Sequence, residues 1–159
     1  MSETMPIAQP LILPCGAVIP NRLAKGAMTE GLATSEGLPT PELARLYRVW
    51  SHGGAGLLLT GNVVIDRDHL ERPGNVILDS PPSPAMQAAL QDWARAGTEG
   101  GNQLWMQLSH AGRQTQSNVN PAPRAPSDSG GRRDCGTLVK QFRGPRICSK
   151  SRHGNCNRH

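Results

Sequence analysis

The sequence predicts an α/β fold that is built on a parallel sheet. Short apolar runs, each long enough for one strand, alternate with stretches of about a dozen residues in which apolar side chains recur at helical spacing. The run over residues 55–65 is apolar without alternation, which is typical of a parallel strand covered on both faces. Strands and helices that alternate in this way indicate βαβ units.

Length and composition fit one domain with a modest core. The chain has 159 residues, of which 36% are hydrophobic and 3% aromatic, so the apolar surface available for burial is limited. No apolar run reaches the ~18 residues of a membrane span. The first five residues, Met1 to Met5, lack the basic and apolar regions of a signal peptide. We therefore expect a cytoplasmic protein without a membrane segment.

The N-terminal part begins with a predicted hairpin, a strand and a loop. Residues 6–20 hold two apolar runs around Pro14–Gly16, a turn that glycine favours because positive φ is cheap for it. Residues 23–29 are a short run between loops and are predicted to be the first strand of the sheet. The polar, glycine-containing residues 29–39 are predicted to be a loop.

Two helices are predicted from their capping residues. Thr40 is a suitable N-cap and Pro41 suits the first helical position, with apolar residues at helical spacing up to Gly53–Gly54. Ser83 and Pro84 repeat this pattern at the start of the second helix, which further glycines close. The intervening residues 67–82 are expected to be a loop, and residues 103–108 the next strand.

Polar side chains lie near the ends of the three predicted parallel strands. Thr29 follows the first strand, Asn62 lies in the second, and Gln107 and His110 end the third. The carboxyl ends of parallel strands meet at one edge of a sheet, where α/β proteins bind ligands. We therefore expect these four residues to converge. Neither a dinucleotide-binding glycine motif nor a phosphate-binding loop is present in the sequence.

The composition changes near residue 130, and we divide the chain there into a domain of residues 1–130 and a tail of residues 131–159. The tail carries eight Lys or Arg and one Asp, whereas the preceding part carries nine basic and eleven acidic residues. We expect the tail to be disordered, with no more than weak, non-specific contacts to nucleic acid. A zinc site is disfavoured because the Cys and His spacing in residues 148–159 matches no common pattern.

Four motifs in order resemble the Old Yellow Enzyme family, the FMN-dependent NADH:flavin oxidoreductases. Residues 13–29 resemble the opening of that family, and residues 53–63 resemble its next strand. The most specific match is Gln107-Leu-Ser-His-Ala-Gly-Arg113, which is similar to the family's Gln-Leu-x-His-x-Gly-Arg stretch. Residues 123–127 fit the loop that follows.

The resemblance implies the N-terminal part of a TIM barrel, incomplete, with about three βα units and a leading hairpin. It implies FMN as cofactor, NADH or NADPH as reductant, and an activated alkene or similar small molecule as acceptor. By resemblance, Ala27, Met28 and Thr29 line the flavin, Asn62 meets its ring system, and Gln107 pairs with its pyrimidine edge.

The family's catalytic residues have no counterpart here, because its substrate-binding His-His or His-Asn pair, its tyrosine and its residues for the FMN phosphate lie on later strands. We therefore expect a truncated or frame-shifted member with impaired or no activity. The alternative is a non-catalytic fragment, or a weak polyanion-binding protein that uses the tail.

The catalytic residues are unknown. His110 is a candidate for proton transfer, but no partner carboxylate or second histidine is expected beside it, and it could equally be a loop residue. His52 and His69 are expected to face solvent, and no metal site is predicted.

Overall fold

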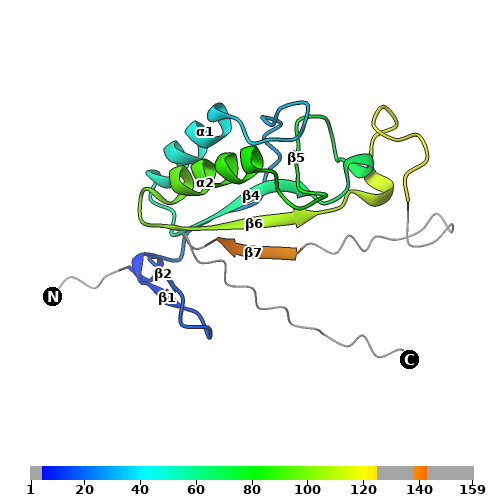
Figure 1. The fold of residues 1–159 in the computed structure, drawn as a ribbon. Coiled ribbons are helices and arrows are strands. Elements are labelled where there is room, and N and C mark those ends of the chain that lie inside the picture. Colours follow the sequence, from blue (N-terminus) through cyan, green and yellow to red (C-terminus); the bar gives the residue numbers. More distant parts are fainter. Residues whose placement is uncertain (1–4, 125–137, 143–159) are drawn as a thin grey trace, which may run out of the picture.

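The computed structural model describes residues 5–124 and 138–142, and its elements follow the predicted α/β order (Figure 1). In chain order they are η1 (Pro6–Ala8), β1 (Leu11–Ile12), β2 (Val18–Ile19), β3 (Ala24–Lys25), α1 (Pro41–Ser51), β4 (Leu57–Val64), η2 (Arg67–His69), β5 (Val76–Ile77), α2 (Pro84–Thr98), β6 (Gln103–Ser109), η3 (Gly112–Gln114) and β7 (Leu138–Phe142).

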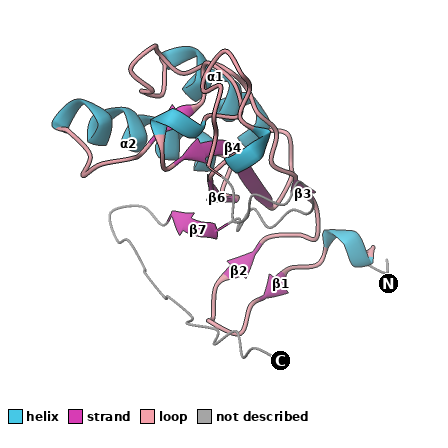
Figure 2. Cartoon of the chain, turned by 90° about the vertical axis from the view of Figure 1, so that its right-hand side faces the viewer, coloured by secondary structure: helices cyan, strands magenta, loops and turns pink. Residues whose placement is uncertain are grey.

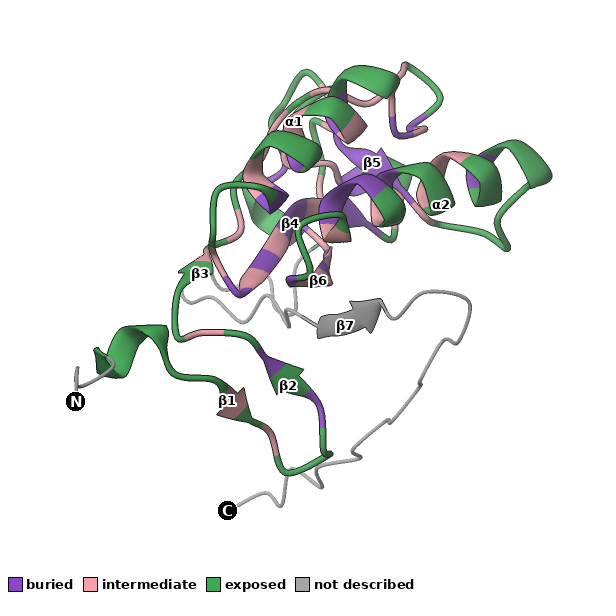
Figure 3. Ribbon diagram, turned by 90° about the vertical axis from the view of Figure 1, so that its left-hand side faces the viewer, coloured by how far each residue is buried: buried purple, intermediate pink, exposed green. Residues whose placement is uncertain are grey.

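One sheet of five strands carries the fold. Its order is β3-β4-β6-β7, and β5 also pairs with β4. Strands β3, β5 and β6 run parallel to β4, whereas β7 runs antiparallel to β6. The predicted hairpin is present as a separate two-stranded sheet of β1 and β2 near the amino ends of the main strands (Figures 1 and 3).

Both helices begin where their capping residues predict. The Thr40 hydroxyl accepts a hydrogen bond from the Leu43 amide at 3.2 Å, and the Ser83 hydroxyl accepts one from the Met86 amide at 3.2 Å. A proline follows each cap, where its missing N–H leaves no hydrogen bond unmade. No helix among residues 5–124 and 138–142 has the length and apolar character that crossing a membrane requires.

The core lies between the two helices and one face of the sheet (Figures 1 and 3). Tyr47 of α1 is completely buried at its centre, and its ring makes edge-to-face contacts with Trp50 and Trp93, at centroid distances of 4.9 and 5.2 Å. The buried cluster consists of Leu43, Tyr47, Leu58, Val63, Val76, Trp93, Leu104 and Met106. Both helical tryptophans therefore pack where the apolar helix faces predict.

Two strands differ from the sequence prediction. The first parallel strand spans only Ala24–Lys25 instead of residues 23–29, and β5 lies inside the predicted loop of residues 67–82. The two differences have one cause: β3 pairs with the beginning of β4, and β5 pairs with its end. Since β6 occupies the other edge of β4, β3 and β5 share a single edge and neither can extend along all of it.

Strand β4 contains a one-residue bulge. Leu59 lies opposite Trp105 and Asn62 lies opposite Gln107, so three steps along β4 correspond to two steps along β6. Side chains normally alternate between the faces of a strand. The extra residue resets this alternation and keeps Asn62 on the same face as Leu59.

The division of the chain into a domain and a tail at residue 130 stays a prediction. Of residues 131–159, the structure describes only β7, which pairs with the edge of β6. The Cys and His residues considered for zinc lie outside the described residues.

Asn21 fastens the segment before β3 to the segment before β4. Its side-chain oxygen accepts hydrogen bonds from the amides of Leu23 and Gly56, at 3.0 and 2.8 Å, and its amide donates to the Gly54 carbonyl at 2.8 Å.

Replacing Asn21 by alanine is expected to lower the free energy of unfolding by about 2 kcal/mol, because two backbone donors lose their acceptor. Urea denaturation of Asn21→Ala and of Asn118→Ala, a control at an exposed asparagine, measures the effect. Equal stability of the two variants would show that the Asn21 bonds contribute nothing.

Candidate functional site

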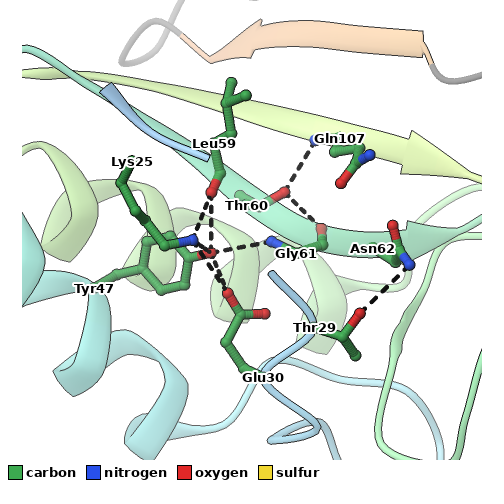
Figure 4. A network of polar contacts seen from close by, with 9 residues as sticks. All are labelled: Lys25, Thr29, Glu30, Tyr47, Leu59, Thr60, Gly61, Asn62 and Gln107. Atoms are coloured by element: carbon green, nitrogen blue, oxygen red, sulfur yellow. Dashed lines mark hydrogen bonds and ion pairs between the residues drawn. The ribbon is translucent and has the colours of Figure 1, made fainter. Parts of the chain in front are cut away.

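Three of the predicted site residues converge at the carboxyl ends of the strands, the end that faces the viewer in Figure 2. Asn62 and Gln107 are direct partners in the pairing of β4 with β6. The Asn62 amide lies 3.4 Å from the Thr29 hydroxyl, as Figure 4 shows. All three side chains are half-buried, so each can still contact a ligand. His110, the fourth residue expected here, lies in a different cluster.

Thr60 holds the bulge that brings Asn62 and Gln107 together. Its buried hydroxyl accepts a hydrogen bond from the Gln107 amide at 3.0 Å and donates one to the Gly61 carbonyl at 2.9 Å (Figure 4). A side-chain oxygen thus serves the Gln107 N–H at the point where the backbone ladder is interrupted. This fixes the position of Gln107 relative to Asn62.

A buried ion pair supports the site from the side of α1 (Figure 4). The Lys25 ammonium lies 3.7 Å from the Glu30 carboxylate, and the two side chains are 13% and 9% exposed. The Tyr47 hydroxyl donates to Glu30 at 2.5 Å and accepts from the Gly61 amide at 3.1 Å. Lys25 also donates to the Leu59 carbonyl at 2.9 Å. The cluster therefore ties the Glu30 loop to the bulge of β4.

The environment shifts two pKa values in this cluster. Burial raises the pKa of Tyr47 far above its usual range, and the neighbouring Glu30 charge adds to the effect. Burial lowers the pKa of Lys25, although the Glu30 carboxylate opposes this. Tyr47 therefore stays a neutral hydroxyl that both donates and accepts.

Gly61 is required where the loop after β3 passes over β4. A side-chain carbon at this position would overlap the Met28 carbonyl oxygen and the Glu30 carboxylate. The close approach brings Met28 and Thr29 to the strand. The Met28 side chain is 53% exposed beside the polar residues, and Ala27 is half-buried before it.

Glu71 is a site residue that the sequence prediction missed. It lies in the loop predicted over residues 67–82, and its carboxylate accepts hydrogen bonds from the Thr29 hydroxyl and, at 2.8 Å, from the Asn62 amide. Burial opposes ionisation, but the bonds from Thr29, Arg72 and Asn62 outweigh it and hold the pKa of Glu71 below its usual range. Glu71 precedes a Pro-Gly turn, and no pattern in the sequence around it predicts this contact.

The prediction that His69 faces solvent is wrong. Its ring is buried and stacks on His110 at a centroid distance of 4.6 Å, and the Asp66 carboxylate contacts both rings, 2.9 Å from Nδ1 of His69 and 3.4 Å from Nε2 of His110. His110 thus has both the partner carboxylate and the second histidine that were not expected. Residues from η2 and from the end of β6 form this cluster, and their sequence spacing does not predict the contact. His52 is exposed as expected.

The three side chains could in principle hold a metal ion, since one ligand atom of each lies within 4.8 Å of the others. The hydrogen bonds disfavour this. Nε2 of His69 accepts from the Arg124 amide at 2.8 Å, and Nδ1 of His110 accepts from the Gly112 amide at 3.0 Å. Each neutral ring then carries its hydrogen on the nitrogen that faces Asp66, which leaves that nitrogen no lone pair for a metal. We therefore interpret the cluster as a hydrogen-bonded clasp between two loops.

The clasp gives a pH-dependent prediction. Burial opposes ionisation of Asp66, but the Asp68 amide and the two histidines outweigh it and hold the pKa of Asp66 below its usual range. A carboxylate with a lowered pKa in the folded state stabilises the protein above its ordinary pKa of about 3.9, and this stability is lost as the pH falls through the lowered value. Asp66→Asn should therefore lose stability at pH 6 and show a smaller further loss between pH 5 and pH 2. Urea denaturation across this range measures it. An unchanged pH profile in Asp66→Asn would contradict the assignment.

Comparisons with known proteins agree with the motifs. No protein-family model matches the sequence. The chain is 36% identical over 106 residues to the NADH-dependent flavin oxidoreductase iliE of Hypocrea jecorina, covering 66% of this chain and 26% of that protein. It is also 36% identical over 120 residues to the NADH-dependent flavin oxidoreductase nadA of Aspergillus parasiticus, covering 69% and 27%. The chain thus spans about a quarter of the length of these curated relatives.

Solved structures agree on the fold. An Old Yellow Enzyme homologue from Zymomonas mobilis matches with a TM-score of 0.66 and 27% identity over 88% of this chain and 39% of its own. Morphinone reductase matches with a TM-score of 0.64 and 21% identity over 94% of this chain and 41% of its own, which bears on the fold alone. The predicted resemblance and fold class are confirmed: the described residues form part of an α/β barrel without closing it.

The side chains at the site fit the edge of a flavin ring. That edge alternates carbonyl oxygens and N–H groups, and the amides of Asn62 and Gln107 each offer both a donor and an acceptor. The exposed thioether of Met28 offers a soft apolar surface beside them. The chemistry of these side chains is therefore compatible with the cofactor that the resemblance implies.

Proposed function

We propose that this chain, about two thirds of which is similar to NADH-dependent flavin oxidoreductases, binds FMN and belongs to an enzyme that passes electrons from NADH or NADPH to an activated alkene or a similar acceptor. When bound, the flavin supplies the electron transfer, and the protein supplies position and electrostatics.

One observation carries the proposal. Thr29, Asn62 and Gln107 come from three separate segments, yet they meet at the carboxyl ends of neighbouring parallel strands, with Asn62 and Gln107 directly paired. This edge of an α/β sheet is where cofactors bind. Gln107 would hold the pyrimidine edge, Asn62 would contact the ring system, and Ala27, Met28 and Thr29 would line it.

The test is FMN binding, measured as quenching of flavin fluorescence by the purified chain. We expect saturable quenching, and we expect Gln107→Leu to weaken FMN binding about tenfold, because the paired amide contacts are worth roughly 1–3 kcal/mol. Gln103→Leu is the matched control, since Gln103 lies on the same strand at the opposite end. Equal loss in both variants, or no saturable quenching by the unsubstituted chain, would overturn the proposal.

Turnover is a separate question from binding. The described residues supply the strands on one side of a barrel, so we propose that they bind the cofactor with impaired or no reduction of an acceptor. Saturable FMN binding without NAD(P)H consumption would support this form of the proposal. Steady consumption would favour a competent enzyme. Cytoplasmic location and a basic tail from residue 131 remain proposals, and so does weak polyanion binding by that tail. Deleting residues 131–159 without changing retention on a polyanion column would remove the last of these.

A further inference from the structure

Glu71 is the carboxylate closest to the proposed flavin contacts, and its position is built into the fold. Strand β5 pairs with the end of β4 and draws the intervening loop back over the carboxyl end of the sheet. The Asn75 side chain accepts a hydrogen bond from the Arg72 amide at 3.1 Å. Gly74 packs closely against Gly31, and its carbonyl accepts from the Ala33 amide at 3.0 Å. The loop that carries Glu71 is therefore held on both sides.

One carboxylate oxygen of Glu71 serves both proposed flavin contacts. Its Oε2 accepts hydrogen bonds from the Thr29 hydroxyl and from the Asn62 amide, whereas its Oε1 accepts from Arg72 at 2.9 Å. The Arg72 side chain is 52% exposed, so water screens its charge more than that of Glu71, which is 29% exposed. The negative charge on Oε2 is therefore directed towards the site.

The bond from Thr29 has a chemical consequence. A threonine hydroxyl has a single hydrogen, and here it points to Glu71. Thr29 can then accept a hydrogen bond from a ring N–H but has none left to donate to a ring carbonyl. In addition, a nearby fixed negative charge disfavours any further negative charge that a ligand gains on reduction.

We propose that Glu71 is a positioning residue that acts through Thr29 and Asn62 to lower the reduction potential of the bound flavin. This inference rests on the proposed function, because it assumes that the ligand of Thr29 and Asn62 is a flavin.

The test compares the reduction potential of FMN bound to the full chain with the potentials in three single variants and one double variant. Glu71→Gln removes the charge and keeps an acceptor oxygen, so we expect its flavin potential to shift to more positive values. Asp79→Asn is the matched control, because Asp79 is also a carboxylate paired with an arginine, Arg67, beside the same strand. We expect no shift there. Thr29→Val removes the hydroxyl, and adding Glu71→Gln to it should then produce a smaller shift than in the unsubstituted chain.

Each outcome decides between the proposals. If the unsubstituted chain does not bind FMN, the proposed function fails and this inference fails with it. If the chain binds FMN but Glu71→Gln leaves the potential unchanged, or if Asp79→Asn shifts it equally, only the role of Glu71 is overturned. Thermal unfolding of each variant without FMN provides the check that a shifted potential does not come from partial unfolding. A positive shift in Glu71→Gln alone, with a folded protein, supports the inference.

Discussion

Replacing Gly61 by alanine is expected to lower the free energy of unfolding by about 3 kcal/mol, the upper part of the range for overpacking a core. The added carbon would overlap the Met28 carbonyl and the Glu30 carboxylate. One of these is backbone and the other is held by Tyr47 and Lys25, so neither can move away without breaking hydrogen bonds. The loop that carries Thr29 would have to lift from β4.

Gly26→Ala is the matched control for this prediction. Gly26 lies in the same loop, and an added carbon there meets no atom within 4 Å. Urea denaturation followed by circular dichroism measures both variants. Similar midpoints for Gly61→Ala and Gly26→Ala would show that the loop can move away from the strand at little cost.

Removing one partner of the buried Lys25–Glu30 pair is expected to have a similarly large effect. Glu30→Gln leaves the Lys25 ammonium without its counter-charge in a site where both side chains are nearly buried, which costs about 3 kcal/mol. The loss should be smaller at pH 10 than at pH 7, because burial has already lowered the pKa of Lys25 and a neutral amine needs no counter-charge.

A double-mutant cycle separates the pair from its surroundings. Lys25→Met with Glu30→Gln removes both charges, so its effect should be smaller than the sum of the two single effects by at least about 1 kcal/mol. Glu99→Gln provides the exposed comparison, because Glu99 pairs with Arg48 at the surface, where such pairs contribute roughly 0–1 kcal/mol. Additive single effects would contradict the prediction.

The helices and the central strands could be predicted because their signals are local. Thr40 and Ser83 act as caps in the way that their sequence neighbours indicate. A continuous apolar run likewise predicts a buried strand, whichever elements cover it. The convergence of Thr29, Asn62 and Gln107 also followed from topology alone, since parallel strands place their ends together. Their role in binding a flavin stays a prediction that the experiments above test.

The missed features all depend on contacts between distant segments. His69 is buried because His110, which follows β6, and the Arg124 backbone contact it, whereas most of its neighbours in sequence are polar. Glu71 joins the site because β5, only two residues long, turns its loop back over the sheet. A strand that short carries no periodic pattern. Sequence patterns therefore do not predict contacts that form because a very short strand redirects a loop.

The bulge in β4 also limits how the length of this strand can change during evolution. Deleting one residue at Gly61 would restore an even pairing with β6, and the backbone ladder itself would lose nothing. Asn62 would stay opposite Gln107 on the same face, but the chain would lose the Gly61 amide that donates to the Tyr47 hydroxyl and the Gly61 carbonyl that accepts from Thr60. The exact number of residues in β4 is therefore under as much constraint as their chemical type.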